Sequence, residues 1–215
     1  MIIQRFIKGI PALDEDEVEK ILVRGILCNW WRNVQYLPPE NIQDRLDEDH
    51  LDWHQNRYEE KHPDYNNEPF KKHTPFISTT AGTVEQDTAM MTHHYFAAWH
   101  EALRFATDFG KTDGWLFHGY VFVLGKKSVE LRQFAEELRE LNIYTGFSPF
   151  HPEGEITAKI IIPSAQIDRA EFYDLSKVDQ ALSQGQRPIP DESEVHSNSA
   201  YQPPEKYVNL RDLLD

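Results

Sequence analysis

The sequence contains a single cysteine, Cys28, and no long apolar run. One cysteine excludes an intrachain disulfide and any metal site built from several thiolates. No stretch reaches the roughly 20 apolar residues that a membrane-spanning helix needs, and the first residues lack the basic start and apolar core of a secretory signal. We therefore expect a protein that is cytoplasmic as synthesised and has no membrane partner, while export by a signal-independent route stays open.

Basic residues are also scarce, with 22 lysines and arginines against 36 aspartates and glutamates and a formal net charge of −14. A surface that binds nucleic acid usually carries excess positive charge. Nucleic acid is therefore a less favoured partner, although the charge leaves room for a local basic groove. The chain also lacks a phosphate-binding glycine-rich loop, so kinase, P-loop and Rossmann functions have no support.

Hydrophobic residues make up 40% of the 215 residues, enough for one domain with a core. Short strand-like segments separated by helices of uneven length predict an α+β fold. We expect the domain to span residues 1–180, with an acidic helical excursion on its surface at 38–68. The polar, proline-rich stretch 181–215 predicts a mobile tail whose last residues form a docking helix.

One helix has clear signals at both ends. Asp14 with Glu17 three residues later predicts its N-terminus, and Gly25 predicts its end. The ten histidines raise the question of a metal site. A metalloprotease helix would need histidine at the position of Arg104, so we expect no metal.

Two glutamates, Glu153 and Glu155, stand two residues apart before an apolar stretch. Side chains at this spacing on a strand point to the same face. Two adjacent negative charges repel each other, and a protein tolerates this where a cationic ligand or transition state must bind. The alternative, favoured for the pair taken alone, is that both simply face water.

Two further motifs carry polar side chains on expected strands. Ser78, Thr79 and Thr80 end one strand, where hydroxyls can hold a carboxylate, or merely reflect strand and turn propensity. Arg5 lies within the apolar strand 2–7, and its planar guanidinium suits a diphosphate. An edge strand with Arg5 facing solvent is an equally good interpretation.

Taken in order, the three motifs resemble the arginine–serine–glutamate class of mono-ADP-ribosyltransferases, the cholera-toxin-like branch. That family has an arginine on the first strand, then a Ser-Thr-Ser motif, then Glu-x-Glu followed by Ile-Pro. The corresponding stretches are "QRFIKGIPALDEDEVEKILVRGI", "KHTPFISTT" and, as the closest match, "GFSPFHPEGEITAKIIIPSAQI". The resemblance covers the three motif blocks within residues 2 to about 175, but neither the acidic excursion nor the tail. It implies two packed, mostly antiparallel sheets flanked by helices, with an NAD cleft between them.

The resemblance also implies a role for each motif residue. NAD is the co-substrate, and its nicotinamide–ribose bond breaks. Glu155 is the catalytic residue that stabilises the cationic ribose, and Ser78 orients it. The residues implied on the cofactor side are Arg5 with Arg24 as its rival, His73, Ser78, Thr79 and Thr80.

Glu153 would face the acceptor, because in this family glutamate at the first position accompanies arginine as the modified residue. Tyr144, Phe147 and Phe150 would press on the target surface, or serve only in loop packing. The expected partners are NAD, a target protein with an acceptor arginine, and an inhibitory immunity or antitoxin protein. The expected biological role is that of a toxin, effector or host-modifying factor.

Three alternatives stay open. The same fold could modify a nucleotide or nucleic acid, or hydrolyse NAD. From a different class, the chain could be a catalytically inactive binding module that docks through "YVNLRDLLD". The intact trio of Arg5, Ser78 and Glu155 argues against the inactive module.

Overall fold

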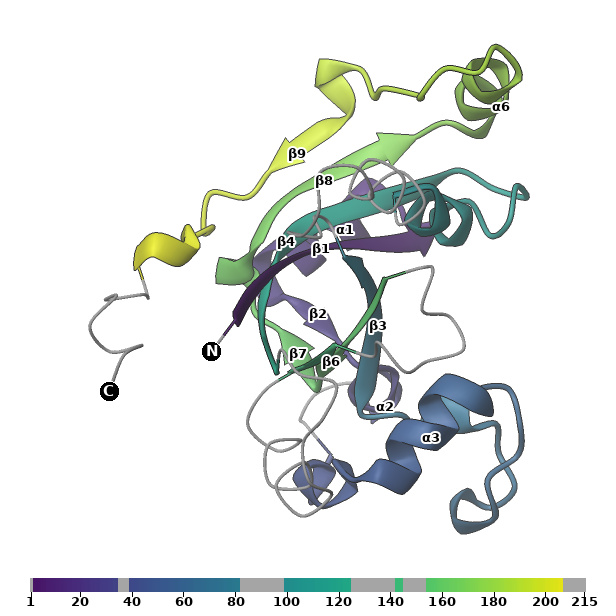
Figure 1. The fold of residues 1–215 in the computed structure, drawn as a ribbon, viewed down its shortest axis with the longest axis vertical. Coiled ribbons are helices and arrows are strands. Elements are labelled where there is room, and N and C mark those ends of the chain that lie inside the picture. The colour runs from purple at the N-terminus through teal and green to yellow at the C-terminus, as the bar shows by residue number, and fades with distance from the viewer. Residues whose placement is uncertain (1, 35–38, 82–98, 125–141, 145–153, 207–215) are drawn as a thin grey trace.

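The computed structural model describes residues 2–34, 39–81, 99–124, 142–144 and 154–206 (Figure 1). The helices are α1 (Glu15–Arg24), α2 (Asn29–Val34), α3 (Glu48–Asn56) and α6 (Leu175–Ser183), and residues 99–106 are also helical. The strands are β1 (Ile2–Pro11), β2 (Ile26–Leu27), β3 (Phe76–Ala81), β4 (Gly114–Leu124), β5 (Asn142–Tyr144), β6 (Glu155–Lys159), β7 (Ile161–Ile162), β8 (Ile167–Tyr173) and β9 (Val195–Ser197). In the described part of the chain, none of the helices has the length and apolar character needed to span a bilayer.

Seven strands form one sheet in the order β1-β3-β6-β5-β4-β8-β9, and β1 also pairs with β4. The pairing of β1, β3, β6, β5 and β4 therefore closes on itself, while β8 and β9 extend beyond β4. The pairs are antiparallel except β4–β5, which is parallel. A small antiparallel sheet joins β2 to β7. The predicted α+β class is confirmed. Most of the strands belong to one curved sheet, and helices pack against it (Figure 1).

Helix α1 forms as its sequence signals predict. Asp14 accepts a hydrogen bond from the Glu17 N–H, and the Glu17 side chain accepts one from the Asp14 N–H, which completes a capping box. The helix ends at Gly25, whose φ of 93° lies in the region that favours glycine. Its apolar face, with Val18 and Leu22 buried, packs into the main core cluster of the sheet.

Helical residues 99–106 lie directly on the backbones of β1 and β4. A Cβ atom at Gly9 would lie 2.1 Å from the carbonyl oxygen of Ala102, and one at Gly114 only 1.6 Å from that of Ala106. The two glycines and two alanines thus allow a backbone-to-backbone approach that larger side chains would prevent. This contact sets the position of the helical segment, and with it one wall of the cavity described below.

The acidic segment expected as a surface excursion is packed against the domain. Helix α3 begins after the N-cap Asp47, whose side chain accepts from the His50 N–H. Leu46 and Leu51 are buried in a cluster with Phe76 of β3 and Ile143 of β5. The charges of the segment therefore occupy its outer face, while its inner face forms a wall of the domain.

The proline-rich stretch expected as a mobile tail contacts the sheet from β9 as far as Gln202. Strand β9 pairs with β8, and Asn198 Nδ2 donates to the carbonyl oxygens of Ser164 and Ile167, both at 2.8 Å. The Tyr120 hydroxyl donates to the Gln202 carbonyl at 2.9 Å. Backbone pairing, which composition does not reveal, thus places part of this stretch on the sheet. The expected docking helix lies outside the described residues.

Candidate functional site

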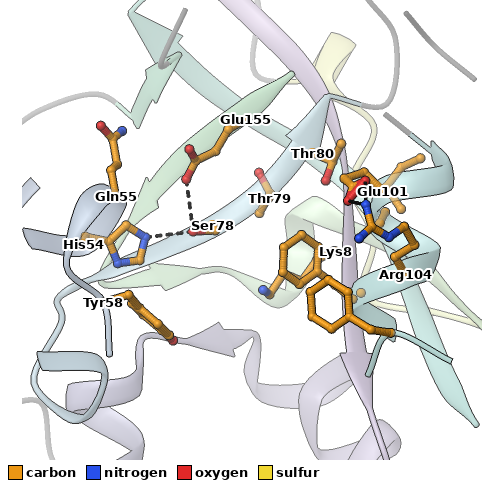
Figure 2. A pocket seen from close by; sticks show the side chains of 15 residues that line it. Lys8, His54, Gln55, Tyr58, Ser78, Thr79, Thr80, Glu101, Arg104 and Glu155 are labelled. Carbon is orange, nitrogen blue, oxygen red and sulfur yellow. Dashed lines mark hydrogen bonds and ion pairs between the residues drawn. The ribbon is translucent and has the colours of Figure 1, made fainter. Parts of the chain in front are cut away.

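A cavity of about 500 Å³ lies over β1, β3 and β6, between α3 and helical residues 99–106 (Figure 2). Strand residues form its floor, and the two helical segments form its sides. Its lining comprises Ile7, Lys8, Gly9, His54, Gln55, Tyr58, Ser78, Thr79, Thr80, Glu101, Ala102, Arg104, Phe105, Phe109 and Glu155. The cavity therefore combines apolar rings, hydroxyls, a histidine and both signs of charge.

Ser78 and Glu155 meet in this cavity as the motifs predict. Strands β3 and β6 are antiparallel neighbours in which Thr80 stands opposite Glu155. Ser78, two residues before Thr80, points to the same face. Its hydroxyl donates to Glu155 Oε1 at 3.1 Å. The structure thus supplies the geometry expected for a serine that orients the glutamate.

The contact between Ser78 and Glu155 is continued by two further groups, the ring of His54 and the hydroxyl of Thr74. His54 Nε2 lies 2.9 Å from Ser78 Oγ, and His54 Nδ1 lies 2.8 Å from Thr74 Oγ1. Thr74 Oγ1 in turn accepts from the Phe76 N–H at 3.1 Å. Figure 2 shows Ser78 between His54 and Glu155, with a hydrogen bond on each side. Four hydrogen bonds therefore connect a backbone N–H with the glutamate.

The protonation state of His54 determines which group donates in each of these hydrogen bonds. Burial, followed by the positive charge of Lys8, lowers the pKa of His54 to about 3, so the ring is neutral at physiological pH. Ser78 donates to Glu155 and so accepts from Nε2–H. Nδ1 is then the acceptor, and it receives the hydroxyl proton of Thr74. Every donor points toward Glu155, and such aligned hydrogen bonds strengthen one another.

The positive charges beside the cavity are not those expected from the sequence. Lys8 lines the cavity, whereas Arg5, three residues earlier on β1, is exposed, points to the other face and does not line it. Arg24 ends α1 as an exposed residue and is also absent from the lining. Strand direction thus places Lys8, and neither Arg5 nor Arg24, in the cavity lining, while a diphosphate contact at Arg5 or Arg24 stays a prediction.

The ammonium group of Lys8 is electrostatically unusual. Burial and the positive charge of Arg32 lower the pKa of Lys8 to about 8, although Glu155 acts in the opposite direction. Among the described residues, no carboxylate forms an ion pair with Lys8 Nζ within 4.0 Å. A half-buried ammonium group with a lowered pKa and no ion pair among the described residues favours an anionic ligand.

Three other expected cofactor residues differ in placement. Thr79 and Thr80 line the cavity, but the Thr79 hydroxyl donates to the Ile156 carbonyl at 2.9 Å and so helps to join β3 to β6. His73 does not line the cavity. Its ring stacks on Tyr65 with centroids 4.5 Å apart, and its Nε2 lies 2.9 Å from Glu68 Oε2. His73 therefore belongs to the outer side of the acidic segment.

The residues expected on the acceptor side stay predictions. Glu153, Phe147 and Phe150 lie outside the described residues. The backbone of Tyr144 pairs with that of Ile156 in β6. This strand places Tyr144 next to the strand that carries Glu155.

The side of the cavity formed by α3 is what sequence reasoning missed. His54, Gln55 and Tyr58 come from a segment whose many charges suggested a solvated surface. The available signal was the spacing of Leu51 and His54, which places a histidine on the apolar face of a helix. Gln55 Nε2 is buried and has no hydrogen-bond partner among the described residues, so it is a candidate donor to a ligand.

No family model and no curated protein matches the chain. Among solved structures, it is similar to a guanine-specific ADP-ribosyltransferase with 11% identity and a TM-score of 0.39, covering 94% of this chain and 81% of that one. It is similar to EcPltA with 15% identity and a TM-score of 0.39, covering 94% and 87%. A mutant of the A subunit of heat-labile enterotoxin gives 14% identity and a TM-score of 0.38, covering 95% and 79%. Because these TM-scores are below 0.5, the similarities carry no argument about function, which rests on the cavity and the sequence motifs.

Proposed function

We propose that the protein is an NAD-dependent mono-ADP-ribosyltransferase. The observation that carries this proposal is the directed chain from Thr74 through His54 and Ser78 to Glu155, which holds a carboxylate at the wall of a cavity. The motif resemblance supports the same assignment of Ser78 and Glu155. A carboxylate held in place by such a chain of hydrogen bonds suits a reaction whose transition state is cationic.

In the proposed reaction, the bond between nicotinamide and ribose C1′ breaks. Nicotinamide leaves with the bonding electron pair as a neutral molecule, and positive charge develops on the ribose, as in glycoside cleavage. Glu155 stabilises that charge. The hydrogen bond from Ser78 restricts the carboxylate, and His54 and Thr74 act as positioning residues because they act through Ser78.

Lys8 takes the role that the sequence suggested for Arg5. Its ammonium group would bind the NAD diphosphate, whose negative charge would stabilise the protonated form. The carboxamide of Gln55 supplies a candidate donor for a hydroxyl or carbonyl oxygen of the ligand. Together with Glu155, these groups address both signs of charge on NAD.

For the acceptor, we propose an arginine of a target protein. An arginine guanidinium is protonated in water and is a poor nucleophile, so a carboxylate that binds it and accepts its proton is needed. Glu153 would take this role, with Tyr144, Phe147 and Phe150 against the target surface. Activity on cellular proteins would fit a toxin or effector restrained by an inhibitory partner.

The test is to incubate the purified protein with NAD labelled in its adenosine part and a cell lysate. Glu155→Gln is the informative variant, and Glu40→Gln, an exposed carboxylate on the protein surface, is the matched control. We expect labelled proteins with the wild type and Glu40→Gln, and loss of label with Glu155→Gln. If the wild type neither binds NAD nor releases nicotinamide, the proposal is wrong and an inactive binding module becomes the better explanation.

Two further outcomes separate the acceptors. Label that nuclease removes and protease leaves would indicate a nucleic-acid acceptor, whereas nicotinamide release without labelled macromolecules would indicate NAD hydrolysis. Either outcome would contradict arginine transfer while preserving the role of Glu155. Expression in a bacterium of the wild type beside Glu155→Gln tests the toxin role, since equal growth of both strains would contradict it.

A further inference from the structure

Two phenylalanine rings lie half-exposed at the cavity. Phe105 is 46% exposed and Phe109 is 51% exposed, and both line the cavity. Their ring centroids are 5.3 Å apart with an interplanar angle of 66°. Large apolar side chains left open to solvent at a cavity commonly mark a binding surface.

The backbone holds Phe109 in a conformation that is rare for an aromatic residue. Asp108 and Phe109 both have positive φ angles, of 44° and 56°. A bulky side chain seldom occupies this region, and such exceptions are concentrated at binding and catalytic sites. The Phe109 N–H donates to the Arg104 carbonyl at 2.7 Å, and the Gly110 N–H donates to Thr107 Oγ1 at 3.2 Å. These two hydrogen bonds hold the backbone of Phe109 and Gly110 in place.

A neutralised ion pair completes this end of the cavity. Arg104 Nη1 donates to both carboxylate oxygens of Glu101, and the distance from Nη1 to Oε2 is 2.8 Å. The Arg104 guanidinium carbon lies 5.2 Å from the Phe109 ring centroid. Because Glu101 balances the charge of Arg104, this end of the cavity suits a flat, uncharged ring better than a phosphate.

We infer that Phe105 and Phe109 bind the adenine ring of NAD, an inference that rests on the proposed function. In Figure 2, Ser78 and Glu155 lie on one side, Lys8 follows, and Arg104 with Glu101 lies on the other side. NAD has the same order, with the nicotinamide ribose, then the diphosphate, then adenosine. Aromatic side chains bind bases by stacking on their faces.

The position of the rings favours adenine over a ring of the acceptor. An acceptor must reach ribose C1′, which the proposal places beside Glu155. Phe105 and Phe109 belong to the segment that carries Arg104, and in Figure 2 Arg104 lies on the other side of Lys8 from Glu155. A ring stacked there would be separated from C1′ by the diphosphate site, so the structure assigns this surface to the cofactor.

The inference is tested by calorimetric titration of three ligands: ADP-ribose, ADP and nicotinamide mononucleotide, which lacks adenine. Phe109→Leu keeps an apolar side chain but removes the flat ring, and Phe109→Trp restores one. Val23→Ala, at an exposed residue of α1, is the control for altered surface. We expect Phe109→Leu to raise the Kd of ADP-ribose and ADP by about 5- to 100-fold. Phe109→Trp should bind ADP-ribose like the wild type, and no variant should change the Kd of nicotinamide mononucleotide.

An unchanged Kd of ADP-ribose in Phe109→Leu, or an equal loss for nicotinamide mononucleotide, would overturn the adenine assignment. If nicotinamide release by the wild type still requires Glu155 in that case, the proposed function stands without it. If Phe109→Leu weakens only the adenine-containing ligands but Glu155→Gln releases nicotinamide at the wild-type rate, the adenine site stands and the proposed catalysis is wrong. A wild type that binds none of the three ligands contradicts both.

Discussion

Glu155 and Glu171 both lie near a histidine, Glu155 through the hydroxyl of Ser78 and Glu171 by direct contact, and the groups that hold them differ in charge. Glu155, at the cavity, accepts from the neutral hydroxyl of Ser78, which accepts from neutral His54. Glu171, on β8, accepts from Arg169 Nε at 2.8 Å and from the Tyr173 hydroxyl at 3.1 Å. Its Oε2 also lies 2.9 Å from His118 Nε2.

The consequence appears in the acidity of Glu171. Burial alone would raise its pKa, but the hydrogen bonds and charges of His118 and Arg169 lower the pKa of Glu171 to about 2. Its negative charge is thus balanced within the protein, and the cluster fastens β8 to β4. Glu155 instead accepts its hydrogen bond from the uncharged hydroxyl of Ser78, and its charge acts on the nearby ammonium group of Lys8. A glutamate beside a histidine is therefore not by itself a catalytic feature, because the charges around it decide its role.

The largest expected effects come from removing each charge in turn. Glu155→Gln should lower the rate of nicotinamide release by about 100-fold or more, with a melting temperature close to that of the wild type. Glu171→Gln should lower the free energy of unfolding by about 1–3 kcal/mol, because it removes the charge that accepts from Arg169, which is partly exposed and keeps Asp168 as a partner. Its activity per folded molecule should be retained. Chromatographic nicotinamide release and denaturant unfolding measure the two effects, and a stable but inactive Glu171→Gln protein would contradict the comparison.

The next largest effect concerns the loss of stability at low pH, which we expect to depend on Glu171. Because its folded pKa of about 2 lies below the ordinary value of 4.5, its contribution to stability is complete above about pH 4.5 and is lost as pH falls toward 2. The shift corresponds to about 3 kcal/mol. Unfolding free energies of the wild type should therefore fall more steeply than those of Glu171→Gln over this window. Parallel curves for the two proteins would show that Glu171 is not the group responsible.

The positioning chain at Glu155 should be sensitive to a single hydroxyl. Thr74→Val leaves the Phe76 N–H and His54 Nδ1 without a partner, at a cost of about 1–3 kcal/mol of unfolding free energy. It should also lower kcat, since His54 loses the contact that orients its ring. Thr157→Val is the control: its Oγ1 is buried and none of the described residues forms a hydrogen bond with it, so stability and kcat should be unchanged or slightly improved. Equal effects of the two substitutions would indicate packing alone.

The smallest effect concerns Lys8, whose ammonium group should bind the diphosphate only while protonated. With a pKa of about 8 in the free protein, the Kd of ADP-ribose should be nearly constant below that pH and rise by about tenfold per pH unit above it. Lys8→Arg should keep its affinity to higher pH because its guanidinium stays charged. Lys8→Met should bind weakly with no such dependence. The same pH dependence in Lys8→Met, measured by calorimetry, would assign the effect to another group.

The sequence predicted the parts of the fold that local chemistry determines. The capping box of Asp14 and Glu17 marked the start of α1, and the strand-like segments marked β3 and β6. The pair of Ser78 and Glu155 was identified from motif wording, and their hydrogen bond confirms that they meet. Within the stretch 181–215, the pairing of β9 with β8 could not be predicted, because it depends on a distant strand rather than on the composition of the stretch.

The choice between Arg5 and Lys8 shows why the rest of the site could not be predicted. Both are cations in one apolar strand, and they point to opposite faces. Which face borders a cavity depends on what packs there. His54 presents the same difficulty, since α3 brings it to Ser78 from 24 residues away only through the burial of Leu46 and Leu51.

By itself, the sequence determined the capping of α1, the alternation along the strands and the motif pair of Ser78 and Glu155, because these depend on neighbouring residues or on spacing along a strand. Only the tertiary structure decided that Lys8 lines the cavity, that the acidic segment supplies His54, and that His54 is neutral with its proton directed to Ser78. The physical reason is that burial and long-range packing set the solvation and protonation of a side chain, and neither is encoded by its neighbours in the chain.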